Sequence, residues 1–183
     1  MNIRRLLSIV GLWLGAASVL AAAAVQTTIQ VVPLAREGRI YVSFKMADGF
    51  TDEVAEAIHS GLTLTFLYDV DLKRSASVWF DRTIASTTVS ATVKYDTLTR
   101  KYSVTRAYDG RIESADSTDS EEVVRGWLTS FDRLPLFSSA GLEPNAEYYL
   151  RVRARTSPRT ALWFFLPWNS HDVAGMARFT FIP

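Results

Sequence analysis

The chain has 183 residues, a formal net charge of +1 and no cysteine. The balanced charge gives no global electrostatic basis for binding nucleic acid or an anionic membrane surface. The lack of cysteine excludes disulfides, thiolate metal ligands and a thiol nucleophile, so a domain of this length must be held together by core burial.

The first 24 residues have the three parts of a secretory signal peptide. Arg4 and Arg5 precede an apolar run over residues 6–20, and four alanines follow it. Signal peptidase requires small side chains at positions −3 and −1. The alanines supply them for cleavage before Val25 or one residue earlier, which predicts export to the periplasm.

An uncleaved anchor in the inner membrane is the alternative, because residues 6–24 are nearly long enough to span a bilayer. Half of this stretch is Gly, Ala and Ser, which insert weakly, so we favour cleavage. A lipid anchor is excluded because bacterial lipoproteins need a cysteine at the cleavage site. The remaining residues, 25–183, are expected to form a single domain. Cleavage removes two arginines and no acidic residue, which changes the formal charge from +1 to −1.

After the leader, apolar and polar residues alternate with a period of two, which indicates strands with one buried and one wet face. Such strands are typical of antiparallel sheets. A short helix interrupts the pattern, with Thr51 placed as its N-cap and Gly61 as its C-terminal cap. The N-terminal half thus predicts strands at Thr27–Pro33 and Ile40–Met46, a helix at Thr51–Ser60 and a strand at Leu62–Val70.

The C-terminal half continues the alternation around a second helix. Thr118 and Glu121 have capping-box spacing, and an apolar stripe follows them. The polar stretch Arg111–Ser117 and the proline-containing stretch Leu134–Asn145 are predicted to be loops. The elements predicted in this half are strands at Val89–Tyr95 and Tyr102–Val104, a helix at Thr118–Phe131, and strands at Tyr148–Ala154 and Ala177–Pro183, with a hairpin loop at Asp96–Arg100 and a turn at Asp109–Gly110. The whole pattern predicts an all-β (β-rich) fold, an antiparallel β-sandwich of seven to nine strands with two short helices.

Three arginines, Arg151, Arg153 and Arg155, form the sharpest feature of the exported chain. On a strand all three project from one face, about 7 Å apart. Such a row is suited to clamping phosphates or carboxylates, for example those of lipid head groups or an acidic partner. The commoner arrangement is an exposed face on which arginines pair with acidic residues of a neighbouring strand.

Two carboxylates, Asp69 and Asp71, share one face of a predicted strand. They are suited to holding Ca²⁺ or to shifting each other's pKa. We favour a simpler interpretation, in which Lys73 and Arg74 neutralise them at a wet strand end.

The remaining candidates point away from catalysis. Neither His59 nor His171 has a second histidine at metal-ligand spacing. The aromatic run Trp163–Trp168 is expected to be a buried strand, with a membrane-interface or protein-docking patch as the alternative. We find no phosphate loop, zinc-binding helix, nucleophile elbow or nucleic-acid motif. The sequence therefore predicts no enzyme activity, no catalytic residue, no cofactor, no metal and no nucleic-acid partner.

Five segments in order resemble one family. They are the Gly-Leu-x-Leu-x-Phe strand at Gly61–Phe66, the Lys-Arg run before a tryptophan at Lys73–Trp79, the hairpin Tyr95–Val104, the Tyr-x-Leu-Arg-Val-Arg strand at Tyr148–Arg153, and a tryptophan near the C-terminus, Trp163 or Trp168. Over residues 27–180 the chain resembles DUF4390, a proteobacterial family of secreted proteins. The resemblance implies no established activity and no catalytic residues. Genes of this family often lie beside those of a membrane-bound sensor kinase, which implies an accessory role in the envelope.

We therefore expect an exported, non-enzymatic binding or accessory protein of the cell envelope, such as a modulator of a membrane sensor kinase. Its predicted contact surface is the arginine row, Arg151, Arg153 and Arg155. The alternative is a carrier of a lipid or other apolar ligand between two sheets, in a cavity lined by Phe44, Phe66 and Trp127. A hydrolase using isolated carboxylates is a third hypothesis, but nothing in the sequence pairs a nucleophile with a base.

Overall fold

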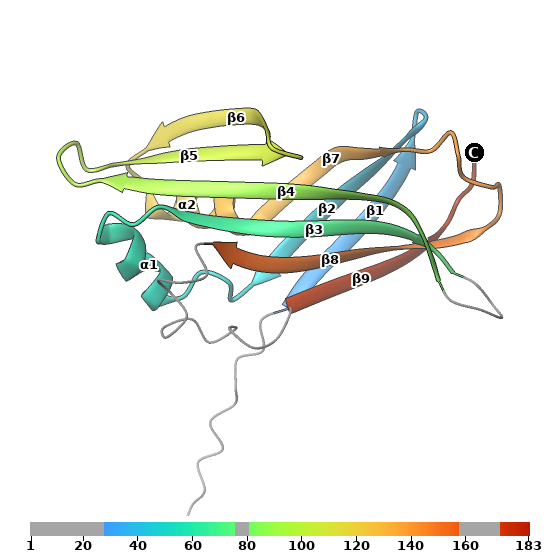
Figure 1. Cartoon of the computed structure of the whole chain (residues 1–183), viewed down its shortest axis with the longest axis horizontal. Helices are drawn as coiled ribbons and strands as arrows, with labels where there is room; N and C mark the ends of the chain where they lie inside the picture. The colour runs from blue at the N-terminus through green and yellow to red at the C-terminus, as the bar shows by residue number, and fades with distance from the viewer. Residues whose placement is uncertain (1–27, 76–80, 158–172) are drawn as a thin grey trace, which may run out of the picture.

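The computed structural model describes residues 28–75, 81–157 and 173–183, which form nine strands and two helices (Figure 1). The predicted signal peptide, His171 and the aromatic run Trp163–Trp168 lie outside the described residues. The elements are β1 (Thr28–Arg36), β2 (Arg39–Ala47), α1 (Asp52–His59), β3 (Leu64–Arg74), β4 (Arg82–Asp96), β5 (Lys101–Tyr108), β6 (Arg111–Thr118), α2 (Glu121–Thr129), β7 (Ser130–Ser138), β8 (Glu147–Ser157) and β9 (Val173–Thr180).

Two antiparallel sheets make up the fold, as the alternating pattern predicted. The smaller sheet has the strand order β1-β2-β7, and the larger has the order β6-β5-β4-β3-β8-β9. Figure 1 shows the smaller sheet crossing behind the larger one at an angle, with both helices near one end of the larger sheet. The prediction of an all-β, sandwich-like fold with two helices is therefore confirmed.

The core lies between the two sheets, where the apolar positions of the alternating strands meet. From β2, Phe44 packs against Tyr68 of β3 and Phe131 of β7, with ring centroids 5.0 and 4.5 Å apart. The hydroxyl of Tyr68 donates a 2.7 Å hydrogen bond to the carbonyl of Leu128 in α2. A fully buried hydroxyl needs such a partner, because a polar group without one costs free energy in the core.

The sandwich is tight where β1 crosses β9. A Cβ atom added at Gly175 of β9 would lie 2.1 Å from the backbone oxygen of Ile29 in β1. Glycine is thus required here because two backbones approach closely, which brings together the edge strands of the two sheets on one side of the core.

The helix α1 begins as the sequence predicted. The Thr51 side chain accepts a 3.4 Å hydrogen bond from the amide of Val54, and Val54 and Ile58 are buried. Ser60 is the C-cap, and Gly61 follows it in the left-handed conformation with φ +86°. The glycine therefore lies one residue beyond the cap, where the chain leaves the helix.

The helix α2 is shorter than predicted at both ends. Its N-cap is Ser120, whose side chain accepts a hydrogen bond from the amide of Val123. Thr118, the predicted N-cap, is instead the last residue of β6 and pairs with Tyr102 of β5. At the other end, Ser130 is extended and the chain enters β7 directly. Phe131 therefore reaches the core from a strand, and Val123, predicted to be on the apolar stripe, is 48% exposed.

A partly buried arginine covers the C-terminus of α2. The guanidinium of Arg106 in β5 lies 4.6 Å from the ring centroid of Trp127 and 4.4 Å from that of Phe131. It donates 2.7 Å hydrogen bonds to the carbonyls of Trp127 and Ser130. These bonds satisfy carbonyl groups that a helix end leaves without an intrahelical partner.

Two predicted loops are strands in the structure. Arg111–Ser117 falls within β6, and the first part of Leu134–Asn145 falls within β7. Both are edge strands of their sheets. An edge strand can be polar on both faces, as β6 is, and it tolerates Pro135, because a missing N–H removes no ladder bond on the open side.

The strand at the C-terminus is also shifted. It was predicted at Ala177–Pro183, whereas β9 ends at Thr180. Phe181 then exchanges backbone hydrogen bonds with the loop before β8, donating to Ala146 and accepting from Asn145. Neither α1 nor α2, the helices among the described residues, is long and apolar enough to cross a membrane.

Candidate functional site

The arginine row lies where the sequence placed it, on the outer surface of the larger sheet. In β8, Leu150 and Val152 are fully buried, and the alternate residues Arg151, Arg153 and Arg155 point to the other side. Their side chains are 35%, 36% and 38% exposed. We call these three side chains the arginine face.

Two carboxylates of the neighbouring strand β3 hold the arginine face in place. Asp71 Oδ2 lies 2.9 Å from Arg151 Nη2 and 3.6 Å from Arg153 Nη2, and Asp69 Oδ1 lies 2.7 Å from Arg155 Nη2. The predicted pairing of arginines with cross-strand acids is therefore confirmed. The prediction that Arg74 neutralises the two carboxylates is wrong. Arg74 pairs with Glu143, and the carboxylates pair with arginines of β8.

Hydroxyl groups of β4 complete the environment of these carboxylates. Ser86 donates a 2.7 Å hydrogen bond to Asp71, and Thr88 donates a 3.3 Å bond to Asp69. Burial alone would raise the pKa of Asp71. The pKa is nevertheless lowered, because Asp71 accepts hydrogen bonds from Ser86 and Arg151 and lies near the positive charges of Arg151 and Arg153. Asp71 is therefore a fixed negative charge between two guanidinium groups.

Among the described residues, the ion pairs of the arginine face join three guanidinium groups to two carboxylates. The Nε atoms of Arg151 and Arg153 are buried and have no hydrogen-bond partner among the described residues. These buried Nε atoms are closed to a partner, but the side chains of Arg151 and Arg153 are partly exposed and carry N–H donors beyond the ones that face Asp71.

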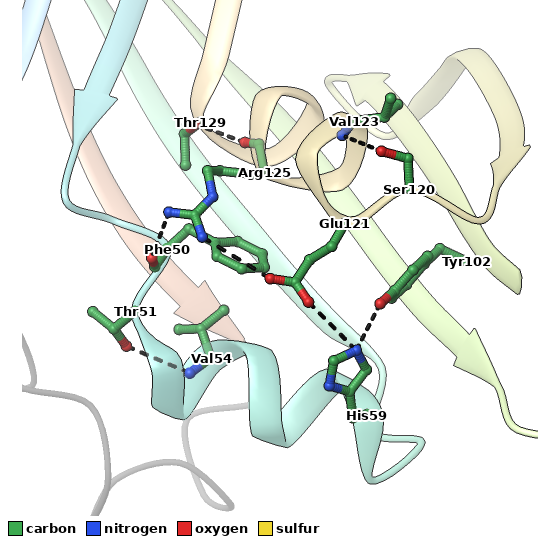
Figure 2. A network of polar contacts seen from close by, with 10 residues as sticks. All are labelled: Phe50, Thr51, Val54, His59, Tyr102, Ser120, Glu121, Val123, Arg125 and Thr129. Atoms are coloured by element: carbon green, nitrogen blue, oxygen red, sulfur yellow. Dashed lines mark hydrogen bonds and ion pairs between the residues drawn. The ribbon is translucent and has the colours of Figure 1, made fainter. Parts of the chain in front are cut away.

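A second polar cluster lies between the two helices and the end of β5 (Figure 2). His59 Nε2 is 2.6 Å from the hydroxyl of Tyr102 and 3.6 Å from Oε2 of Glu121. These residues come from the last turn of α1, the start of β5 and the first turn of α2. We call them the His–Tyr–Glu cluster. It brings an imidazole, a phenol and a carboxylate to one point.

Neighbouring groups fix this cluster from two sides. Arg125 Nη2 lies 4.0 Å from Oε1 of Glu121, and its guanidinium stacks on Phe50, which leaves Oε2 of Glu121 facing His59. The ring of Tyr95 lies 5.3 Å from His59 and 4.8 Å from Tyr102 between centroids. Burial, followed by the charges of Glu121 and Tyr95, raises the pKa of Tyr102.

Sequence reasoning found His59 but neither of its partners. Tyr102 is 43 positions away in the sequence, and Glu121 was noticed only as part of a capping box. A contact between three separate elements leaves no local pattern. Among the described residues, no group of three or more His, Cys, Asp or Glu side chains is placed to hold a metal.

The aromatic residues proposed to line a ligand cavity are part of the packed structure. Phe44 and Phe66 are 2% and 1% exposed, and Phe44 contacts two other rings. Trp127 is partly buried and packs against the same core cluster, with the guanidinium of Arg106 over its ring. Carriage of an apolar ligand stays a prediction.

The chain belongs to the DUF4390 family, described as a domain of unknown function, whose model matches residues 22–161. This match confirms the resemblance seen in the sequence. Comparison with curated proteins and with solved structures gave no match.

Proposed function

We propose that this protein is an exported, non-enzymatic accessory protein of the cell envelope that binds an acidic surface of a membrane protein through its arginine face. The observation that carries the proposal is the row of three partly exposed guanidinium groups on β8, whose ion pairs fix them on one outer face of the larger sheet. Such a row offers N–H donors and positive charge at about 7 Å intervals to carboxylates of a partner.

The surroundings of the row favour a protein contact. On the same outer face, β3 and β4 present the hydroxyls of Thr65, Thr88, Ser90 and Thr92, as the register of the two strands requires. Thr65 and Thr92 are hydrogen-bonded to each other at 2.9 Å. This polar, partly exposed sheet surface suits a non-obligate interface, which is only about as apolar as the rest of a protein surface.

The first partner to test is the external domain of a membrane sensor kinase, which the family resemblance brings forward. The experiment is crosslinking in live cells, with a photoreactive residue in place of Ser90 on the proposed surface. The same residue in place of Lys45, on the outer face of the smaller sheet, is the control. Reproducible capture of one membrane protein from position 90 alone supports the proposal. Equal capture from both positions, or from neither, contradicts it.

The matched substitution is Arg153→Gln, compared with Arg39→Gln on the outer face of the smaller sheet. Arg153 lies farther from Asp71 than Arg151 does, at 3.6 Å against 2.9 Å, so its neutralisation leaves the shorter pair intact. Charge reversal would put a second carboxylate beside Asp71 and destabilise the fold. We expect Arg153→Gln to weaken capture about tenfold or more, as loss of a charged interface contact does, and Arg39→Gln to leave it unchanged.

A further inference from the structure

The His–Tyr–Glu cluster joins three elements at a point where one side chain can change its charge. His59 is the last residue of α1, Tyr102 lies at the start of β5 and Glu121 in the first turn of α2. An imidazole gains a proton between about pH 8 and pH 5, whereas a glutamate carboxylate stays charged and a phenol stays neutral over that interval. Burial moves the pKa of Tyr102 still higher. Of the three groups, His59 therefore sets how the charge of the cluster responds to pH.

Both contacts of the cluster meet at Nε2 of His59 (Figure 2). This atom lies 2.6 Å from the hydroxyl of Tyr102 and 3.6 Å from Oε2 of Glu121. A neutral ring shares a hydrogen bond with the hydroxyl but has no charge for the carboxylate to attract. Protonation adds a positive charge, so that the ring and the carboxylate become an ion pair between α1 and α2. The side chains of His59 and Glu121 are 46% and 40% exposed, so the ring can exchange its proton with solvent.

The neighbouring groups leave one carboxylate oxygen to His59. On α2, Arg125 Nη2 lies 4.0 Å from Oε1 of Glu121, whereas the other oxygen faces the imidazole. On β4 and β5, the groups beside the ring are the phenols of Tyr95 and Tyr102, which add no charge at neutral or mildly acidic pH. A change in the charge of the ring is therefore felt directly by Glu121.

We infer that protonation of His59 fastens α1 to α2, so that the end of the molecule that carries both helices is held more firmly in mild acid than at neutral pH. The helix α1 has eight residues and buries only Val54 and Ile58. A helix of this length is marginal by itself, so one added contact at its end changes how often it opens. The predicted export would expose this contact to changes in external pH. The contact is separate from the arginine face and does not depend on what that face binds.

The test is amide hydrogen exchange of α1 in the purified protein at about pH 5.5 and about pH 7.5, corrected for the intrinsic pH dependence of exchange. Wild type, His59→Gln, Glu121→Gln and the double variant form a double-mutant cycle. An exposed ion pair changes an equilibrium constant by up to about fivefold, so we expect the two positions to be coupled about two- to fivefold in acid and uncoupled at neutral pH. The cycle cancels the effect of other charges, such as that of Glu56, one turn before His59 on α1.

Glu122→Gln is the matched control. Glu122 shares the first turn of α2 with Glu121, but of these two carboxylates only Glu121 is paired with His59 in the described part of the chain. Its substitution should therefore alter the protection of α1 equally at both pH values. The chain has two histidines, so the imidazole signals of His59 in NMR spectra are assigned by their loss in His59→Gln. In the wild type these signals should shift over the same pH interval as the protection of α1 changes.

Equal coupling at both pH values, or none in acid, overturns the inference. It is also overturned if Glu122→Gln changes the pH dependence as much as Glu121→Gln does. If His59→Gln does not fold, as judged by circular dichroism, the wild type and Glu121→Gln are compared alone. A difference in α1 protection that grows as the pH falls then supports the inference, and one that is independent of pH contradicts it.

Discussion

Replacement of Asp71 by asparagine tests whether the pairing on the outer face stabilises the fold. The side chain of Asp71 is only 10% exposed and bonds to Ser86 and Arg151. In one orientation of the asparagine amide, its oxygen accepts from Ser86 and its NH₂ group faces the guanidinium of Arg151, where Asp71 accepts a 2.9 Å bond. In the flipped orientation its oxygen accepts from Arg151 and its NH₂ group faces Ser86. The main loss is one hydrogen bond to a charged group, which contributes about 1.5–3 kcal/mol.

This loss of folding free energy should lower the melting temperature, Tm, by a measurable amount. In a domain of this size, 1 kcal/mol corresponds to about 2–4 °C in Tm, so Asp71→Asn should lower Tm by about 3–12 °C near pH 7. Urea unfolding monitored by tryptophan fluorescence gives the free energy directly. Asp132→Asn is the control, because the side chain of Asp132 is 70% exposed and its ion pair with Arg133 should matter much less.

The same substitution has a defined pH dependence. The pKa of Asp71 is lowered in the folded state from its usual 3.8, so its contribution is fully present above about pH 4. As pH falls further, the unfolded chain takes up the proton first, and the contribution is lost as the pH passes the folded pKa. The stability difference between wild type and Asp71→Asn should therefore shrink below pH 4. A difference under about 0.5 kcal/mol at pH 7, or one that does not change with pH, would refute the reasoning.

Three further substitutions test the packing, each by urea unfolding. Gly175→Ala should destabilise by about 1–3 kcal/mol, because its Cβ would lie 2.1 Å from the oxygen of Ile29, and no loss of stability would contradict that close approach. Gly126→Ala should instead stabilise by about 0.5–1 kcal/mol, because it lies in α2 with open space at the Cβ position, and a loss would show that the space is filled. Tyr68→Phe should cost about 1–2 kcal/mol, because the buried carbonyl of Leu128 loses its donor, whereas a neutral result would mean that this bond contributes nothing.

The fold class could be predicted because its signal is local. A strand with one face in the core alternates between apolar and polar residues within its own sequence, as Ile40–Met46 does. Its neighbours in the sheet need not be known to predict it. Two of the edge strands, β6 and β7, could not be predicted in the same way. In β6 both faces are exposed, so the sequence has no reason to alternate, and Pro135 in β7 imitates a loop signal.

For the candidate sites too, features within one strand could be predicted, whereas contacts between separate elements could not. The arginine face was predictable because Arg151, Arg153 and Arg155 lie on one strand, where spacing alone fixes their direction. Their partners on β3 depend on the strand order, in which β8 lies beside β3 across a long sequence separation. The contact of His59 with Tyr102 likewise depends on how α1 packs against the end of the sheet, which composition does not encode.

The arginine face also constrains which wrong structures the chain can form. A slip of β8 by one residue against β3 would turn Arg151, Arg153 and Arg155 toward the apolar interior and expose Leu150 and Val152 to water. The core cluster among the described residues is made of apolar side chains, so burying three charges in it would make the slipped pairing far higher in free energy than the native one. The three arginines would therefore disfavour misregistered pairing of β8, and aggregation through it, while the chain folds and before it binds any partner.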